Sequence, residues 1–293
     1  MQLFYSKKAA PYIFVAPFVI SFLLFFAYPV FSTIIMSFQE VLPGASTFVG
    51  LDNYKRIWNP DFLKAVSNST KYTFFTLLIL IPAPLVIAVF LNSKVMKFRN
   101  FFRAALFIPA LTSVVVAGII FRLAFGGQDT ALMNTFVHLF GGSTQKWLLS
   151  STTGMFVLVL LASWRWMGVN LLYFLSALQS IPNEIYEAAE IDGATAWDKF
   201  LKITLPYLKP VTIYVLTISI YGGYSMFAES YMLWGGNRSP NGIGSTIIGY
   251  IYQTGLERNE MGFGAAVGLI LFAITMVING IQLKFFGLFK KGE

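Results

Sequence analysis

The sequence predicts an all-α membrane protein, built as a single transmembrane domain over residues 1–293. Hydrophobic residues make up 56% of the chain and charged residues only 12%, which is more apolar surface than a soluble domain of this size could bury. Six apolar runs are each long enough to cross a hydrocarbon core of about 30 Å. Between the fourth and fifth runs, a polar stretch has the pattern of two short helices joined by a turn.

Six membrane-spanning helices follow from the apolar runs. Prolines inside them predict kinks, because neighbouring helices can satisfy the carbonyl groups that a proline leaves free. Lys7 and Lys8 before the first run resemble the start of a signal peptide, but the run is too long for one and is interpreted as an uncleaved span. The expected spans are approximately Tyr12–Met36, Tyr72–Leu91, Ala104–Phe125, Met155–Leu178, Val211–Leu233 and Phe263–Phe286.

The distribution of basic residues predicts the orientation of the chain in the membrane. The net charge is +8, but the Lys and Arg residues flank the apolar runs and form no single patch, which argues against nucleic-acid binding. The short loop Asn92–Arg103 carries four basic residues and no acidic one, and loops of this kind stay on the cytosolic side. Both termini and the polar stretch Asn183–Pro206 are therefore expected in the cytosol.

The polar stretch Asn183–Pro206 begins with a pattern typical of a short helix. Asn183 is expected to cap this helix, and Glu184 and Glu187 lie in its first turns, where the helix dipole favours acidic side chains. Gly193 is expected to end the helix, because glycine adopts the left-handed conformation at low cost.

The second half of the polar stretch predicts another helix. Thr195, with Asp198 three residues later, matches a capping box at its start. Leu205-Pro206 is expected to close it, because the residue before a proline avoids helical angles. Docking onto a soluble partner would explain why such a segment is ordered between two spans. The alternative is an amphipathic connector that lies on the membrane surface.

A charged residue, Arg165, lies near the middle of the fourth apolar run between Trp164 and Trp166. A charge at this depth costs several kcal/mol unless it faces a cavity or a partner, so Arg165 is expected to face protein or water. Glu229 is the acidic candidate within a span, but it lies nearer the outer end of an antiparallel helix, so direct contact would need a long reach. A pathway-lining role and a structural ion pair are both open.

Several classes of chemistry are excluded by what the sequence lacks. The absence of cysteine excludes disulfides and thiolate metal sites, and the single histidine, His138, excludes a multi-histidine metal site. No phosphate-loop motif occurs, so no nucleotide site of that kind is expected in this chain. No catalytic pair or nucleophile elbow is found either. The chain is therefore expected to hold no cofactor or metal of its own and to catalyse no covalent chemistry.

The polar stretch resembles the EAA signature of ABC importer permeases, and Asn183–Pro206 is called the EAA segment from here on. The resemblance extends over nearly the whole chain. The chain is similar to the maltose- and lactose-type sugar permeases, and within these it resembles the first-position permease of the usual pair. The residues that resemblance assigns to ATPase coupling are Glu187, Ala188, Ala189, Asp192, Gly193, Ile203, Leu205 and Pro206. Further matching stretches are Tyr28-Pro29, Phe48–Tyr54, Phe107–Pro109, Leu178–Pro182 and Ile191–Ala194.

This resemblance implies the type I ABC importer permease fold in a bacterial inner (plasma) membrane. It also implies a heterodimer with a second permease, two copies of an ABC ATPase subunit that bind ATP and Mg²⁺, and an extracytoplasmic sugar-binding protein. The sequence departs from the family where Ala228, rather than an acidic residue, follows Phe227 and Glu229 comes one position later. A Gly-Gly-Pro motif is also interrupted between Gly235 and Pro240, which indicates a reshaped outer loop.

Resemblance to maltose-type permeases further implies a sugar pathway lined by the fourth and fifth runs. In the fifth run, polar and aromatic residues recur on one helical face from Ile218 to Glu229. Aromatic rings can stack on the C–H surfaces of a sugar while Tyr, Ser and Asn exchange hydrogen bonds with its hydroxyl groups; ordinary helix packing is the alternative. The candidate pathway residues are Trp164, Arg165, Trp166, Val169, Asn170, Tyr173, Tyr221, Gly222, Ser225 and Glu229.

The expected function is therefore a permease subunit of an ATP-driven importer for a sugar, of the di- or oligosaccharide class. A permease for glycerol phosphate or another polar solute is the nearest alternative, since Arg165 could favour an anion. An ion-coupled secondary transporter would need intramembrane carboxylates, and Glu229 is the one candidate. A membrane enzyme has no motif in its support. The identity of the sugar is left open.

Overall fold

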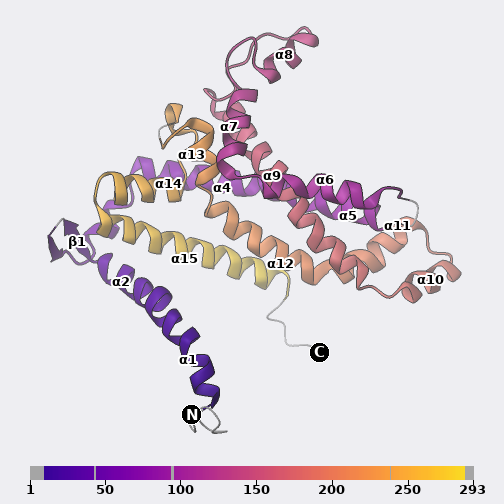
Figure 1. Cartoon of the computed structure of the whole chain (residues 1–293), viewed down its shortest axis with the longest axis horizontal. Helices are drawn as coiled ribbons and strands as arrows, with labels where there is room; N and C mark the ends of the chain where they lie inside the picture. The colour runs from indigo at the N-terminus through magenta and orange to yellow at the C-terminus, as the bar shows by residue number, and fades with distance from the viewer. Residues whose placement is uncertain (1–9, 43, 94–95, 238, 288–293) are drawn as a thin grey trace. The chain divides into compact units, whose positions relative to one another are not determined.

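The computed structural model describes residues 10–42, 44–93, 96–237 and 239–287, and Figure 1 shows the course of the chain. By their contacts the residues fall into two compact units, which are described separately: unit 1 (Met1–Asn59 and Ile251–Phe272) and unit 2 (Pro60–Tyr250 and Ala273–Glu293). The prediction of one transmembrane domain stays a prediction. The basic pair Lys7 and Lys8, used above to interpret the N-terminus, lies outside the described residues.

Unit 1 begins with a long apolar helix, and no residue of its most apolar stretch is buried among the residues that the structure describes. A wider π-helical turn precedes Pro29 in this helix, and the Tyr28 N–H bonds to the Leu23 carbonyl. Such a turn gives room to a proline ring that would clash in a regular α-helix. The elements of unit 1 are α1 (Ala10–Phe22), η2 (Leu23–Ala27), α2 (Tyr28–Met36), β1 (Gln39–Leu42), β2 (Ala45–Phe48), α3 (Asp52–Arg56), η5 (Tyr252–Glu257) and the first part of α15 (Met261–Phe285).

A small β-hairpin follows the first span, with β1 and β2 paired antiparallel. Asn53 is buried, and its Nδ2 donates hydrogen bonds to the carbonyl oxygens of Ser37 at 3.0 Å and Gln39 at 2.9 Å. These bonds tie the hairpin to the helix that follows it. The prediction of an all-α chain missed this hairpin, because its two short strands contain no run of alternating apolar residues.

Unit 2 is built around α9, along which α4, α5, α6 and α12 pack. Gly168 of α9 allows a close approach, because a Cβ there would lie 2.1 Å from the Leu106 carbonyl oxygen of α6. The elements of unit 2 are α4 (Pro60–Leu80), α5 (Pro82–Asn92), α6 (Arg99–Leu111), α7 (Val114–Ala124), α8 (Leu132–Leu139), α9 (Ser151–Gln179), α10 (Asn183–Ile191), α11 (Ala196–Lys199), η3 (Phe200–Thr204), α12 (Leu205–Tyr224), α13 (Ala228–Trp234), η4 (Pro240–Gly242), α14 (Ile247–Ile251) and the last part of α15.

The second span begins earlier than the predicted Tyr72. Helix α4 starts at Pro60, and Phe62, Ala65 and Ser69 on one of its faces are buried within the chain. The predicted start was wrong because it was placed where the apolar run begins. The polar turns before that run are helical as well, because one of their faces packs within the chain.

The second span is also broken at Ile81, between α4 and α5. Pro84 has no N–H, so it cannot donate to the carbonyl four residues earlier, which belongs to Leu80. The buried side chain of Asn170 on α9 takes this role, with its Nδ2 donating to the Leu80 oxygen at 2.8 Å. A side chain from a neighbouring helix thus satisfies the freed carbonyl, while Pro60–Asn92 as a whole is long and apolar enough to form one span, and the kink stays a prediction.

The third predicted span, Ala104–Phe125, is not one continuous helix. Helices α6 and α7 meet at an angle of 97°. Thr112 and Ser113 between them have extended ψ angles of 130° and 138°, and the Ser113 hydroxyl accepts a hydrogen bond from the Val115 N–H, which caps α7. The prediction was wrong because the apolar run continues on both sides of this polar cap.

The fifth predicted span, Val211–Leu233, is also interrupted. Helix α12 ends at Tyr224, the chain leaves helical geometry at Phe227 (φ −144°), and α13 is a separate short helix. Close packing precedes the break, since a Cβ on Gly223 would lie 2.4 Å from the Thr73 hydroxyl of α4. Five described helices are long and apolar enough to cross a membrane, and α6 with α7 makes a sixth if the bent pair counts as one span.

Candidate functional site

The first helix of the EAA segment, α10, ends as the sequence predicts. Gly193 has a left-handed φ of +78°, and the N–H of Ala194 bonds back to the Ala189 carbonyl at 2.8 Å. The predicted cap is wrong. Asn183 is the first helical residue, and the cap position belongs to Pro182, whose extended backbone (ψ 133°) starts the helix without a side-chain bond.

The second helix starts at the predicted capping box. The Thr195 hydroxyl accepts a hydrogen bond from the Asp198 N–H at 3.1 Å, and the Asp198 carboxylate accepts one from the Thr195 N–H at 3.3 Å. The predicted stop at Leu205-Pro206 is wrong, because Leu205 keeps helical angles and the chain continues into α12. The π-helical turn η3 ends just before the proline, as in the first span, and gives the proline ring room.

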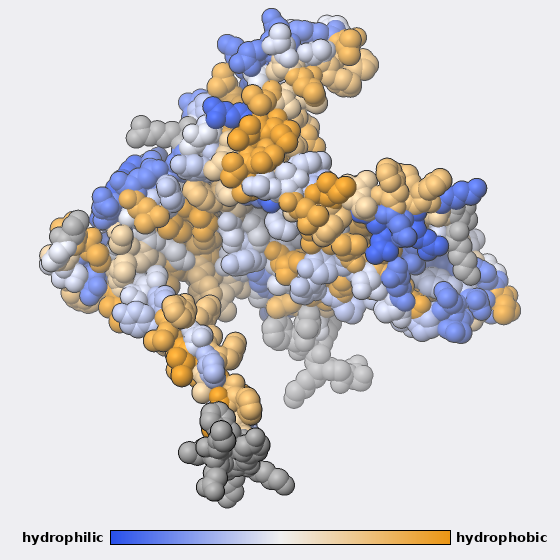
Figure 2. Space-filling view, in the orientation of Figure 1, coloured by the Kyte–Doolittle hydropathy of each residue, from blue (hydrophilic) through white to orange (hydrophobic). Residues whose placement is uncertain are grey.

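Side-chain contacts fix the two halves of the EAA segment to each other. Lys199 Nζ lies 2.6 Å from Glu190 Oε1, which links α11 to α10. The hydroxyl groups of Tyr186 and Thr204 lie 2.9 Å apart and join α10 to η3. The segment is therefore a small folded unit attached to the base of α12, and Figure 2 shows hydrophilic residues over it.

The predicted coupling residues divide into an exposed group and a packed group. Ile203 and Leu205 are half-buried, and Leu205 packs against the apolar cluster that α5, α9 and α12 share. Ala189 is half-buried as well. The exposed coupling residues are Glu187, Ala188, Asp192, Gly193 and Pro206.

Two large apolar side chains at the tip of the EAA segment were missed by the sequence reasoning. Ile191 is 87% exposed and Trp197 is 66% exposed, and they lie on either side of the Gly193 turn. The sequence did contain a signal for these two residues, because each is an apolar residue within a polar segment and lies near the turn glycine.

Arg165 and Glu229 form a direct ion pair, with Arg165 Nη1 2.6 Å from Glu229 Oε1 and both side chains 12% exposed. The Arg165 guanidinium also lies 5.6 Å from the ring centre of Trp166. The expectation that contact would need a long reach was wrong, because the break after α12 lets α13 place Glu229 against α9. The prediction that Arg165 faces protein or water fits this geometry.

The other candidate pathway residues do not form one face. Tyr221 and Gly222 are exposed on α12, Ser225 is half-buried at its C-cap, and Glu229 lies on α13, so the predicted single helical face from Ile218 to Glu229 is wrong. The helix ends between these residues, and periodicity does not carry across the break.

On α9, the candidate residues have different surroundings. Trp164 and Trp166 are exposed, Val169 is half-buried, and Asn170 is buried with its amide bonded to Leu80. Tyr173 lies against Tyr214 of α12, with ring centres 5.3 Å apart. The structure thus joins α9 to α12 at Tyr173 and to α13 at the ion pair. Substrate contact by these residues stays a prediction.

No group of three or more His, Asp or Glu side chains within the described part of the chain could hold a metal ion. A groove of about 960 Å³ lies between α4 and α9, and none of the candidate pathway residues lines it. The groove is mainly apolar, with its polar groups gathered at one end. The groove is therefore treated apart from the candidate pathway.

Sequence comparisons connect this architecture to known transport proteins. Residues 72–286 match the family model described as binding-protein-dependent transport system inner membrane component. The arabinooligosaccharides transport system permease protein AraP of Bacillus subtilis is 61% identical over 99% of this chain and 92% of that protein. AraP of Halalkalibacterium halodurans is 53% identical over the same shares of the two chains.

The fold is also similar to that of solved structures. A crystal structure of a bacterial ABC transporter involved in the import of the acidic polysaccharide alginate contains a chain with a TM-score of 0.85 and 23% identity, matched over 96% of both chains. The apolar helices are those of a membrane component, and the family model covers residues 72–286, which include the EAA segment. The chain belongs to the family of inner-membrane components of binding-protein-dependent transport systems.

Proposed function

We propose that the chain is the permease subunit of an ABC importer for oligosaccharides, with arabinose-containing oligosaccharides as the substrate class. The observation that carries the proposal is the 61% identity to AraP of Bacillus subtilis over 99% of this chain. Relatives named for other solutes are more distant, such as the glycerol-3-phosphate permease UgpA of Brucella abortus at 28% identity.

The charge of the candidate pathway supports a neutral substrate. Arg165 would favour an anion such as glycerol phosphate if its charge were free, but Glu229 lies 2.6 Å from it. A paired arginine presents little net charge to a passing solute. The Trp166 ring beside the pair suits the C–H face of a sugar, and the candidate Tyr173 farther along α9 could exchange hydrogen bonds with its hydroxyl groups.

The proposed mechanism is alternating access driven by a separate ATPase. The EAA segment docks in a groove of the ATPase subunit through Ile191 and Trp197, with Glu187 and Asp192 as hydrogen-bond acceptors at its rim. When ATP closes two ATPase subunits, the segment moves with them. Because α11, η3 and α12 form one continuous helix, the motion passes directly to the fifth span.

The proposed assembly holds this chain, a second permease, two copies of an ABC ATPase that carry ATP and Mg²⁺, and an extracytoplasmic sugar-binding protein. The EAA segment and both termini lie in the cytosol. A solved structure with 22% identity to this chain contains a substrate-bound periplasmic protein, which supports the outer partner. This chain contributes the passage and catalyses no hydrolysis.

Complementation tests the proposal. In a Bacillus subtilis strain that lacks AraP, expression of this chain is expected to restore growth on arabinooligosaccharides, because 61% identity preserves most of the contacts with the partners. The strain carrying the Gly193→Leu variant at the same membrane level serves as the matched control and is expected not to grow.

Two outcomes would contradict the proposal. The first is no growth with wild-type protein that is present in the membrane and co-purifies with the ATPase subunit. The second is uptake of radiolabelled arabinooligosaccharide that persists when the ATPase subunit is deleted, since this would indicate a secondary transporter.

A further inference from the structure

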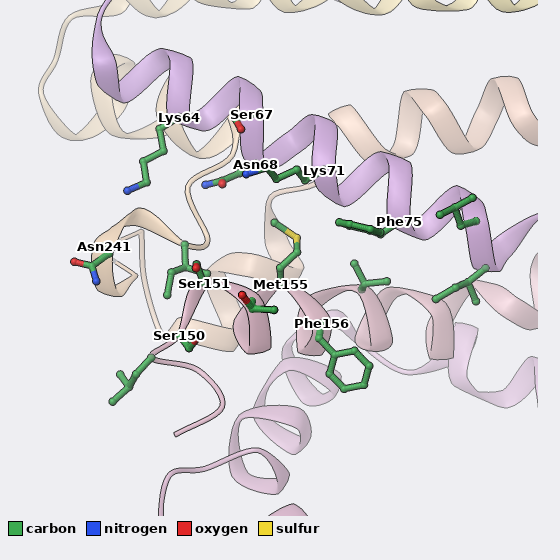
Figure 3. A pocket seen from close by; sticks show the side chains of 16 residues that line it. Lys64, Ser67, Asn68, Lys71, Phe75, Ser150, Ser151, Met155, Phe156 and Asn241 are labelled. Carbon is green, nitrogen blue, oxygen red and sulfur yellow. The ribbon is translucent and has the colours of Figure 1, made fainter. Parts of the chain in front are cut away.

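The groove between α4 and α9 lies within unit 2 and has a volume of about 960 Å³ (Figure 3). We call it the α4–α9 groove. Its volume is at the upper end of the range of roughly 300–1,000 Å³ that is usual for ligand sites. A ligand of substantial size therefore fits it.

Along α4, the lining changes from polar to apolar on one helical face. Lys64, Asn68 and Lys71 line the first turns of this face, and Phe75 and Leu78 line the following turns. These positions are three or four residues apart, which places them in a single row. The face therefore has a charged end and an apolar end.

Along α9, the lining changes in the same direction. Ser151 and Thr152 come first, and Met155, Phe156 and Val159 follow. Figure 3 shows Lys64, Asn241 and Ser151 toward one end and Phe75 and Phe156 toward the other. The two helices thus present their polar ends together, so the groove is amphipathic along its length.

The polar end is cationic. Lys64 and Lys71 are exposed, and neither takes part in an ion pair among the residues that the structure describes. None of the lining residues is acidic. The neighbouring amide of Asn68 is already used, donating to the carbonyl oxygens of Gly242 and Ser245. The two ammonium groups therefore lack an anion.

We propose that the α4–α9 groove binds one anionic phospholipid. Its phosphate lies between Lys64 and Lys71, and its acyl chains run along Phe75, Leu78 and Phe156. Basic pockets between membrane helices bind anionic headgroups, and the apolar half matches the hydrocarbon that follows such a headgroup. A sugar would leave the apolar half unused, and a free anion would fill only the charged end.

Native mass spectrometry of the full-length chain, purified with the subunits that co-purify with it, tests the proposal. The probes are phosphatidylglycerol, which is anionic, and phosphatidylcholine, which is zwitterionic, with matched acyl chains. Wild-type protein is expected to retain phosphatidylglycerol in preference. Each single variant is expected to lose affinity for phosphatidylglycerol about fivefold, because it loses one cationic contact with the anionic lipid. The Lys64→Gln/Lys71→Gln variant loses two such contacts and is expected to lose affinity about 30-fold.

The matched control is Lys97→Gln/Lys146→Gln, which removes the same charge from exposed lysines that do not line the groove and take part in no ion pair among the described residues. It is expected to keep the wild-type preference. Equal binding of both lipids by wild-type protein would overturn the proposal, as would an unchanged preference in the groove variant. Displacement by millimolar inorganic phosphate would indicate a free-anion site instead. Photocrosslinking from a photoreactive residue at position 78 to another subunit would show a protein occupant.

Discussion

Arg165 on α9 and Glu229 on α13 form an ion pair with 2.6 Å between the charged atoms, across an interruption in the chain after α12. The guanidinium Nε of Arg165 is buried and has no hydrogen-bond partner among the described residues. The pair therefore satisfies the charge of the arginine but leaves one donor free.

Removal of one partner of this pair is expected to destabilise the protein. Arg165→Met or Glu229→Leu leaves an uncompensated charge in a site where both side chains are only 12% exposed, which costs about 3–5 kcal/mol. Thermal unfolding in detergent measures the loss. The double variant Arg165→Met/Glu229→Leu is expected to recover most of the stability, and a double variant as unstable as the singles would show that the two charges act separately.

The bond from Asn170 to Leu80 gives a second prediction. Asn170→Ala leaves a buried carbonyl without its donor, which is expected to lower the free energy of unfolding by about 1–3 kcal/mol. Adding Pro84→Ala restores a backbone N–H that can donate to the same carbonyl. The double variant is expected to unfold at a higher temperature than Asn170→Ala alone, and failure of this rescue would mean that Asn170 has another role.

Substitution of Gly193 tests the backbone conformation of the turn separately from side-chain contacts within the chain. The φ of Gly193 is +78°, and a Cβ there would meet no atom within 4 Å, so the Cβ that any substitution adds strains only the backbone. Gly193→Ala and Gly193→Leu are both expected to cost about 1–2 kcal/mol locally and to lower transport-coupled ATP hydrolysis. Gly280→Ala, in the regular helix α15 with equally open space, is the control and is expected to leave activity unchanged. Normal coupling in Gly193→Leu would argue against a fixed turn.

Ile191 and Trp197 are expected to contribute to partner binding and little to folding. Trp197→Ala removes a side chain that is 66% exposed, so the melting temperature of the chain should change little, whereas retention of the ATPase subunit in pull-down should fall at least tenfold. Phe140→Ala, at a residue 78% exposed on the far side of the predicted topology, is the control. Unchanged ATPase retention by Trp197→Ala would place the docking surface elsewhere.

The predicted orientation can be checked with single cysteines, because the chain has none of its own. Ala188→Cys in the EAA segment is expected to react with a membrane-impermeant maleimide only after the cells are permeabilised. Ser143→Cys, in the loop between α8 and α9, is expected to react in intact cells. If Ala188→Cys reacted in intact cells and Ser143→Cys only after permeabilisation, the predicted topology would be reversed. The EAA segment would then lie outside the cell, where it could not contact a cytosolic ATPase.

Local sequence signals predicted local structure well. The Thr195–Asp198 capping box and the Gly193 turn are both present, since each depends on residues a few positions apart. The breaks at Thr112-Ser113 and after Tyr224 were not predicted, because apolar composition continues through both. The first break is capped locally, by the Ser113 hydroxyl that accepts from the Val115 N–H, a signal that the apolar pattern masked. At the second break, a distant arginine pairs with Glu229, which local sequence patterns do not reveal.

The continuous helix from Ala196 to Tyr224 is about 43 Å long at 1.5 Å per residue. Gly223 packs closely against Thr73 near the far end of this rod, and Leu208 and Val215 along it are buried. In the proposed mechanism, a small sideways stroke at the base is therefore carried by the whole span and by the helices packed against it. Insertion of one extra residue at the base would turn the rod by about 100° about its axis, and the stroke would be delivered in the wrong direction.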